Sequence, residues 1–139
     1  MEDSFTEEAQ GGAHNIDRMD ELEGRLRDEL SQWAAEADVE ASIEEMYING
    51  SYGGQNANSD SDVDVTIGVD GATIDECNSA TQQLQQQIGL HDGWWKIDPC
   101  VLPVGRYLYG HLEERSEHGG YQTLYDVLNR DYVSVDSLR

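Results

Sequence analysis

Two aspartates are the residues of this sequence whose type and spacing best suit chemistry on phosphate. Asp62 and Asp64 are separated by one residue in an alternating stretch, so on a strand their side chains point to the same face. Two carboxylates placed in this way can bridge a pair of divalent cations about 3.5–4 Å apart, as two-metal phosphoryl transfer requires. Because carboxylate oxygens are hard ligands, the pair favours Mg²⁺ or Mn²⁺ over zinc.

The residues that precede these aspartates suit the binding of an anion. Gly50 lets the backbone approach a phosphate without a Cβ in the way. Ser51 adds a hydroxyl and an amide, and the amides that follow it can form a concavity that binds anions. Gly50-Ser51 and Asp62 are separated by ten residues.

The periodicity of apolar residues predicts the elements that position these groups. Steps of three and four residues predict a helix from Ile16 to about Ala37, whose buried stripe is Met19, Leu22, Leu26, Leu30 and Trp33. Strands are predicted over Ile43–Ile48 and Asp62–Val69, with a loop over Ser51–Ser61 between them. The second strand has one face in the core, formed by Val63, Val65, Ile67 and Val69.

The remaining elements are predicted in the same way. A second helix covers Thr73–Ile88, and its inward residues are Cys77, Ala80 or Thr81, Leu84 and Ile88. A strand follows over Trp94–Leu102, where Pro99 indicates an edge or a strand end. Shorter elements complete the chain: helices over Tyr107–Glu114 and Tyr121–Asn129, a turn over Ser116–Gly120 and a strand over Tyr132–Val135. This order predicts an α+β domain, a small mixed sheet flanked by helices.

The stretch INGSYGGQNANSDSDVDVTI, Ile48 to Ile67, resembles the motif of the polymerase-beta nucleotidyltransferase superfamily, in particular its minimal, stand-alone members. Those proteins carry a strand ending in Gly-Ser, a ten-residue spacer and an Asp-x-Asp strand. The resemblance implies a nucleotidyltransferase fold in which Ser51 contacts the nucleoside triphosphate and Asp62 and Asp64 hold metal. Family members also have a third carboxylate on a later strand, which helps activate the acceptor hydroxyl. Asp98 is the candidate here, both for that role and as a further metal ligand.

One departure from the family pattern concerns positive charge. Related proteins commonly carry Arg soon after Gly-Ser, whereas no Lys or Arg occurs between Arg27 and Lys96. The phosphate charge must then be met by metal, backbone amides and Ser51, with Lys96 as a further candidate because strand alternation places it on the face of Asp98 and Cys100. The alternative for Asp62, Asp64 and Asp98 is that they are ordinary surface carboxylates on solvent-facing strands.

The chain is strongly acidic, with 29 acidic and 8 basic residues and a net charge of -21. An acidic disordered chain is disfavoured, because the apolar residues are periodic and include three Trp and seven Tyr. A protein that mimics nucleic acid stays open but does not require the motif above. We favour a surface adapted to a multimolar-salt cytoplasm, since Lys96 is the single Lys beside seven Arg, a bias that resembles haloarchaeal proteins. Without a basic patch, unaided binding to nucleic acid is not expected.

Residues 1–15 are predicted to form an acidic flexible tail and residues 16–139 a single nucleotidyltransferase domain. No run of eighteen apolar residues occurs and the amino terminus is acidic, so we expect neither a membrane span nor a signal peptide, and a cytoplasmic protein. Cys77 and Cys100 lack metal-ligand spacing and are expected to be buried, reduced thiols. The four histidines are scattered, so surface or turn positions are expected for them.

Stand-alone family members of this size resemble the antitoxin half of paired toxin–antitoxin modules, whose partner is a helical HEPN-type ribonuclease. The resemblance implies adenylyl transfer from ATP, with Mg²⁺ or Mn²⁺, to a tyrosine of that partner toxin. Two alternatives stay open. An enzyme-like binding module could neutralise a partner by contact alone, or a homo-oligomer could complete a nucleotidyltransferase that acts on small molecules.

Overall fold

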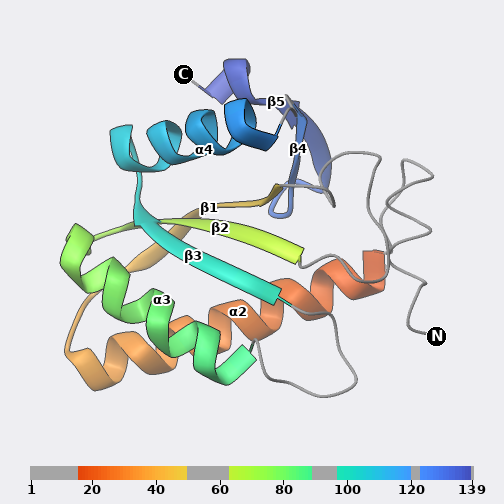
Figure 1. Cartoon of the computed structure of the whole chain (residues 1–139). Coiled ribbons are helices and arrows are strands. Elements are labelled where there is room, and N and C mark those ends of the chain that lie inside the picture. The colour runs from red at the N-terminus through yellow and green to blue at the C-terminus, as the bar shows by residue number, and fades with distance from the viewer. Residues whose placement is uncertain (1–15, 50–62, 89–96, 120–122, 139) are drawn as a thin grey trace.

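The computed structural model describes residues 16–49, 63–88, 97–119 and 123–138, which form a mixed sheet with helices on both faces (Figure 1). The predicted α+β class, with a small mixed sheet flanked by helices, is therefore confirmed. The elements in chain order are α2 (Ile16–Ala37), β1 (Ser42–Asn49), β2 (Val63–Asp70), α3 (Ile74–Ile88), β3 (Ile97–Pro103), α4 (Arg106–Gly119), β4 (Thr123–Asp126), β5 (Asp131–Ser134) and the 3₁₀ helix η2 (Val135–Leu138).

The five strands lie in the order β3-β2-β1-β4-β5. β1 is antiparallel to both β2 and β4, and β4 is antiparallel to β5. β2 and β3 are parallel, and α3 is the crossover that a parallel pair needs. No helix of the described ranges is long and apolar enough to cross a membrane.

One face of the sheet packs against α2 and α3 and holds the larger core. The predicted stripe of α2 is buried at Leu22, Leu26, Leu30 and Trp33. α3 contributes the predicted Cys77, Ala80 and Leu84, and the sheet meets both helices with Met46, Ile48, Val65, Ile67, Val69 and Val101. The first two helices and the first three strands thus lie where the periodicity placed them, within a few residues.

A capping box fixes the start of α3. The Thr73 hydroxyl accepts a hydrogen bond from the Glu76 N–H at 3.2 Å, and the Glu76 carboxylate accepts one from the Thr73 N–H at 2.9 Å. These two bonds satisfy donors that the first turn of a helix leaves unpaired.

Helix α4 covers the opposite face of the sheet. Its Leu108 and Leu112 join a second apolar cluster, completed by Tyr47, Leu124 and Val135. Gly68 lies beneath this helix, where an added Cβ would be 2.7 Å from the Leu108 Cδ2 atom. Thr66 is also buried. The prediction that β2 has one face in the core was therefore incomplete, because α4 packs on the opposite face and buries Thr66 and Gly68 there.

Polar contacts also join α4 to β1. The Glu45 carboxylate accepts hydrogen bonds from the Tyr47 hydroxyl at 2.6 Å and from the Tyr109 hydroxyl of α4 at 3.2 Å. Burial raises the pKa of both tyrosines, so both hydroxyls stay protonated and act as donors. The position of α4 over the sheet is thus fixed by apolar packing and by this shared carboxylate.

The predicted elements after β3 were partly wrong. α4 continues through residues 116–119, where a turn was expected, and Thr123–Asp126 is a strand in place of the helix predicted over Tyr121–Asn129. Leu124, Tyr125 and Leu128 fit helical steps, but short apolar runs do not distinguish helix from strand. The segment is a strand because it pairs with β1. Leu124, Tyr125 and Asp126 are all buried there, whereas the one buried stripe of a surface helix would not include three consecutive residues.

The β4–β5 hairpin is fixed by its turn. The Asp126 carboxylate accepts from the N–H groups of Leu128 and Asn129 at 3.1 and 3.3 Å. Arg130, in the left-handed region at φ 56°, reaches α2 and donates to Glu23 at 3.0 Å. β5, Asp131–Ser134, begins and ends one residue earlier than the strand predicted over Tyr132–Val135.

Strand β3 is an edge of the sheet, as Pro99 indicated, and its outer side is closed. The Val101 N–H donates to the Thr81 hydroxyl of α3 at 2.8 Å, so it points away from β2. Pro99 and Pro103 have the same strand parity as Val101 and carry no N–H. Residues 99, 101 and 103 therefore offer no N–H to a further strand.

Candidate functional site

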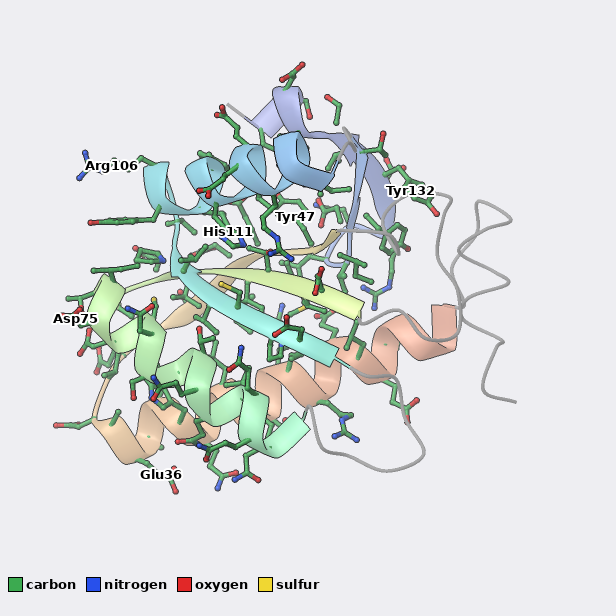
Figure 2. All side chains as sticks on the ribbon, in the orientation of Figure 1. Glu36, Tyr47, Asp75, Arg106, His111 and Tyr132 are labelled. Atoms are coloured by element: carbon green, nitrogen blue, oxygen red, sulfur yellow. The ribbon has the colours of Figure 1, made fainter. Side chains whose placement is uncertain are left out.

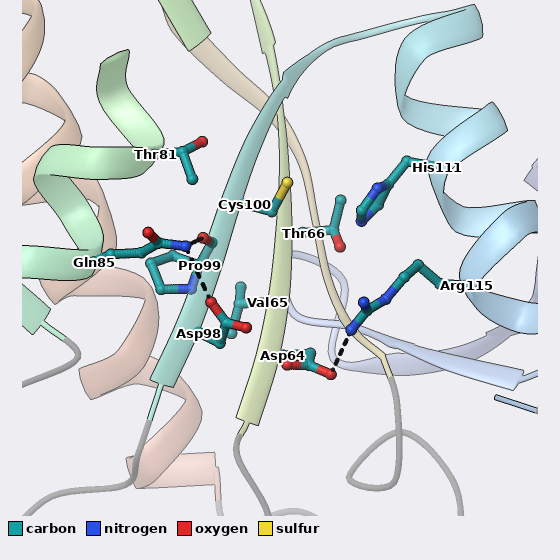
Figure 3. A pocket seen from close by; sticks show the side chains of 10 residues that line it. All are labelled: Asp64, Val65, Thr66, Thr81, Gln85, Asp98, Pro99, Cys100, His111 and Arg115. Atoms are coloured by element: carbon teal, nitrogen blue, oxygen red, sulfur yellow. Dashed lines mark hydrogen bonds and ion pairs between the residues drawn. The ribbon is translucent and has the colours of Figure 1, made fainter. Parts of the chain in front are cut away.

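A hollow of about 180 Å³ opens between α4 and the start of β2 and β3 (Figure 3). Four elements supply its walls, two strands from the sheet and one helix on each side of it. The lining residues are Asp64, Val65, Thr66, Thr81, Gln85, Asp98, Pro99, Cys100, His111 and Arg115.

Two of the predicted site residues lie side by side in the wall of this hollow. Asp64 is the second residue of β2 and Asp98 the second residue of β3, and the parallel register pairs them directly. Neighbouring strands lie about 4.8 Å apart and paired side chains share a face. Carboxylates distant in the sequence thus become neighbours at one end of the sheet, with Asp64 partly buried and Asp98 exposed.

Each of these carboxylates is held by a side chain from a different helix (Figure 3). Nη2 of Arg115, on α4, lies 3.0 Å from Oδ2 of Asp64. Nε2 of Gln85, on α3, donates to Oδ1 of Asp98 at 3.2 Å. The Asp64 side chain is 23% exposed and that of Arg115 47%. An ion pair so open to solvent stabilises a fold by no more than about 1 kcal/mol, so it can be exchanged at low cost.

The other predicted site residues, Asp62, Gly50, Ser51 and Lys96, lie outside the described residues, and their roles stay predictions. Within the described ranges no group of three or more His, Cys, Asp or Glu side chains could hold a metal ion. The donors at the hollow are nevertheless of the kind that Mg²⁺ prefers, since carboxylate oxygens stand on two adjacent strands. The site fits such an ion in donor type, with Asp62 as the predicted additional carboxylate.

Comparison with known proteins identifies no matching family model, curated protein or solved structure. The interpretation of this site therefore rests on its motif and its geometry.

Arg115 and His111 line the hollow but were not predicted from the sequence as candidate site residues. They are four residues apart on α4 and so share a helix face, which is the signal that could have found them. The predicted helix ended at Glu114, one residue short of Arg115. His111 was expected at a surface or turn position, but it is half-buried on the inner side of α4 (Figure 2).

Burial keeps two further groups at the hollow uncharged. Burial, and then the nearby Arg115 guanidinium, lower the pKa of His111 below its usual 6.5. Burial, and then the Asp98 carboxylate, raise the pKa of the Cys100 thiol, so this cysteine is a poor nucleophile. Among the described residues that line the hollow, the charged groups are therefore two carboxylates and one guanidinium, which suit the holding of cations and phosphate and not covalent catalysis by sulfur.

Proposed function

We propose that this chain is a metal-dependent nucleotidyltransferase with the minimal polymerase-beta-type fold, which transfers AMP from ATP to a hydroxyl of a partner protein. The observation that carries the proposal is the register pairing of Asp64 with Asp98 at the wall of a hollow. This pairing places a carboxylate of the Asp-x-Asp strand next to a carboxylate of the neighbouring strand. Transfer of a nucleotide to an acceptor oxygen requires groups that hold the metal and groups that act on the acceptor to lie close together in this way.

The residues take distinct roles in this proposal. Asp64, with Asp62, holds Mg²⁺ or Mn²⁺, which when bound neutralises charge on the phosphates. Gly50 and Ser51 hold the phosphate chain through amides and a hydroxyl, aided by Lys96. The hollow, at about 180 Å³, is smaller than whole-ligand sites of roughly 300–1,000 Å³, so it receives phosphates and the acceptor hydroxyl and not an entire nucleotide.

Asp98 is the group that acts on the acceptor. Gln85 orients its carboxylate through Oδ1, and the side chain is exposed beside the hollow. The acceptor oxygen forms a bond to the α-phosphorus of ATP, the bond to pyrophosphate breaks, and the hydroxyl proton passes to Asp98. We propose a tyrosine of a HEPN-type toxin as the acceptor, docked beside β3.

A binding module without turnover is the second candidate, and the Arg115–Asp64 ion pair is the observation that favours it. The guanidinium already neutralises one of the two carboxylates without any metal. A fold of this kind could then block a partner by contact alone.

The experiment uses ATP, Mg²⁺ and the protein encoded by the adjacent reading frame, in molar KCl, with intact-mass spectrometry as the readout. We expect the partner to gain one AMP moiety with the wild type and none with Asp64→Asn. Asp98→Asn should slow the transfer while ATP binding stays nearly unchanged, because it acts on the acceptor. Asp70→Asn is the matched control, since Asp70 is exposed at the far end of the same strand. Neutralisation of the partner without a mass change, and equally by Asp64→Asn, would establish the contact-only module.

A further inference from the structure

Arg115 is the one Lys or Arg among the described residues that line the hollow. Its guanidinium comes from α4 and touches Asp64, a carboxylate that the proposed function assigns to metal. While this pair is formed, Oδ2 of Asp64 is engaged by the guanidinium. A metal ion that binds Asp64 through Oδ2 therefore displaces Arg115, and the displaced cation then stands within the same hollow.

We propose that Arg115 is the phosphate-binding cation of this site, and that it leaves Asp64 for the phosphates of a nucleoside triphosphate when a divalent cation binds Asp64. The inference rests on the proposed function, because it needs both metal and nucleotide at this place. It also supplies a positive charge to a site whose sequence lacks any Lys or Arg between Arg27 and Lys96.

The geometry allows the exchange. The contact to Asp64 is made through a single guanidinium nitrogen, Nη2, and the Arg115 side chain is 47% exposed. The helix that carries it is held in place by the buried Leu108 and Leu112, so the guanidinium moves while the backbone stays fixed. Arginine suits the second partner, because its planar fork binds phosphate oxygens through two donors at once.

The two halves of the exchange predict opposite effects of a single substitution. In Arg115→Gln, Asp64 loses its competing cation, so Mn²⁺ without nucleotide should bind about two- to fivefold more tightly. The same variant loses a charged donor to the phosphates, so ATP with Mg²⁺ should bind at least about tenfold more weakly. AMP, which lacks the β- and γ-phosphates, should lose less than about threefold by the same reasoning.

The test measures Mn²⁺ binding by the electron paramagnetic resonance signal of free Mn²⁺, and ATP and AMP binding by titration calorimetry with Mg²⁺, all in molar KCl. Arg106→Gln is the matched control, because it removes the same charge from an exposed position at the other end of α4, away from the sheet (Figure 2). It should leave both affinities unchanged within about twofold, and Arg115→Lys should recover part of the ATP affinity.

The outcomes separate this inference from the proposed function. A wild type that binds no ATP with Mg²⁺ overturns both. A wild type that binds ATP while Arg115→Gln binds it equally well, or while Arg106→Gln weakens it as much, overturns the role of Arg115 alone. Weaker binding of ATP together with weaker binding of Mn²⁺ in Arg115→Gln also overturns it, because a merely structural loss moves both affinities in the same direction.

Discussion

Replacing Gly68 by alanine tests how closely α4 approaches the sheet. The new methyl group would lie 2.7 Å from Leu108 Cδ2 and 3.1 Å from Val104 Cγ1. The first distance falls about 0.7 Å short of ordinary contact, which begins near 3.4 Å. Leu108 is fully buried, so its side chain has no open space to enter. Overpacking of this kind costs about 1–3 kcal/mol, and we expect Gly68→Ala to lower the free energy of unfolding by that amount.

Urea unfolding in molar KCl, followed by circular dichroism, measures the effect as a lower midpoint with an unchanged slope. Gly110→Ala is the control on α4 itself, because a Cβ there meets nothing within 4 Å. This control should be stabilised by up to about 1 kcal/mol, since alanine is the better helix former. Leu108→Ala should partly rescue Gly68→Ala, so that the double variant loses at least about 1 kcal/mol less than the two single losses together.

A Gly68→Ala protein as stable as the wild type, or additive losses in the double variant, would refute the close packing of α4 on β2. Because Arg115 and His111 project from this helix, either result would also remove the basis for placing them at the hollow.

Three further predictions follow from the charge, a titrating group and a helix cap. With a net charge of -21, the fold should melt at lower temperature in dilute buffer than in molar KCl by circular dichroism, and equal melting temperatures would contradict a salt-adapted surface. The pKa of His111 is lower in the folded protein than its usual 6.5, so the unfolded chain takes up the proton first as the pH falls. The free energy of unfolding, measured in urea, should therefore fall as the pH drops below about 6.5, and it should fall less steeply in His111→Gln. The same dependence of this free energy on pH in both proteins would contradict the prediction. Thr73→Ala should cost about 1 kcal/mol in urea unfolding through loss of the capping box, whereas Thr73→Ser should cost little; equal losses would argue against the cap.

Local periodicity was enough to place the elements that carry one clear apolar pattern. Leu22, Leu26 and Leu30 repeat at helical steps over a long stretch, and Val65 and Ile67 alternate strictly, so α2 and β2 could be predicted. β4 could not, because it is four residues long and its structure is decided by the free edge of β1, a partner distant in the sequence.

The candidate site likewise contains residues that the local sequence predicts and contacts that depend on the tertiary structure. The Asp-x-Asp spacing pointed to Asp64, and alternation along β3 pointed to Asp98, but their pairing depends on the parallel register of two strands that α3 separates. Arg115 depends on a tertiary contact between α4 and the start of β2, for which the local sequence gives only a helix face. The positive charge beside Asp64 thus comes from a helix that is distant in the sequence.

The closed outer side of β3 limits how other polypeptides can approach the hollow. With prolines at 99 and 103 and the Val101 N–H taken by Thr81, this side cannot act as a template for an added strand, either from a ligand peptide or from a neighbouring copy during aggregation. An acceptor that docks here must present its side chain from a folded surface, because an extended segment would find no backbone donors along residues 99–103. Recognition at this place would then depend on the shape of the partner and not on a linear sequence motif.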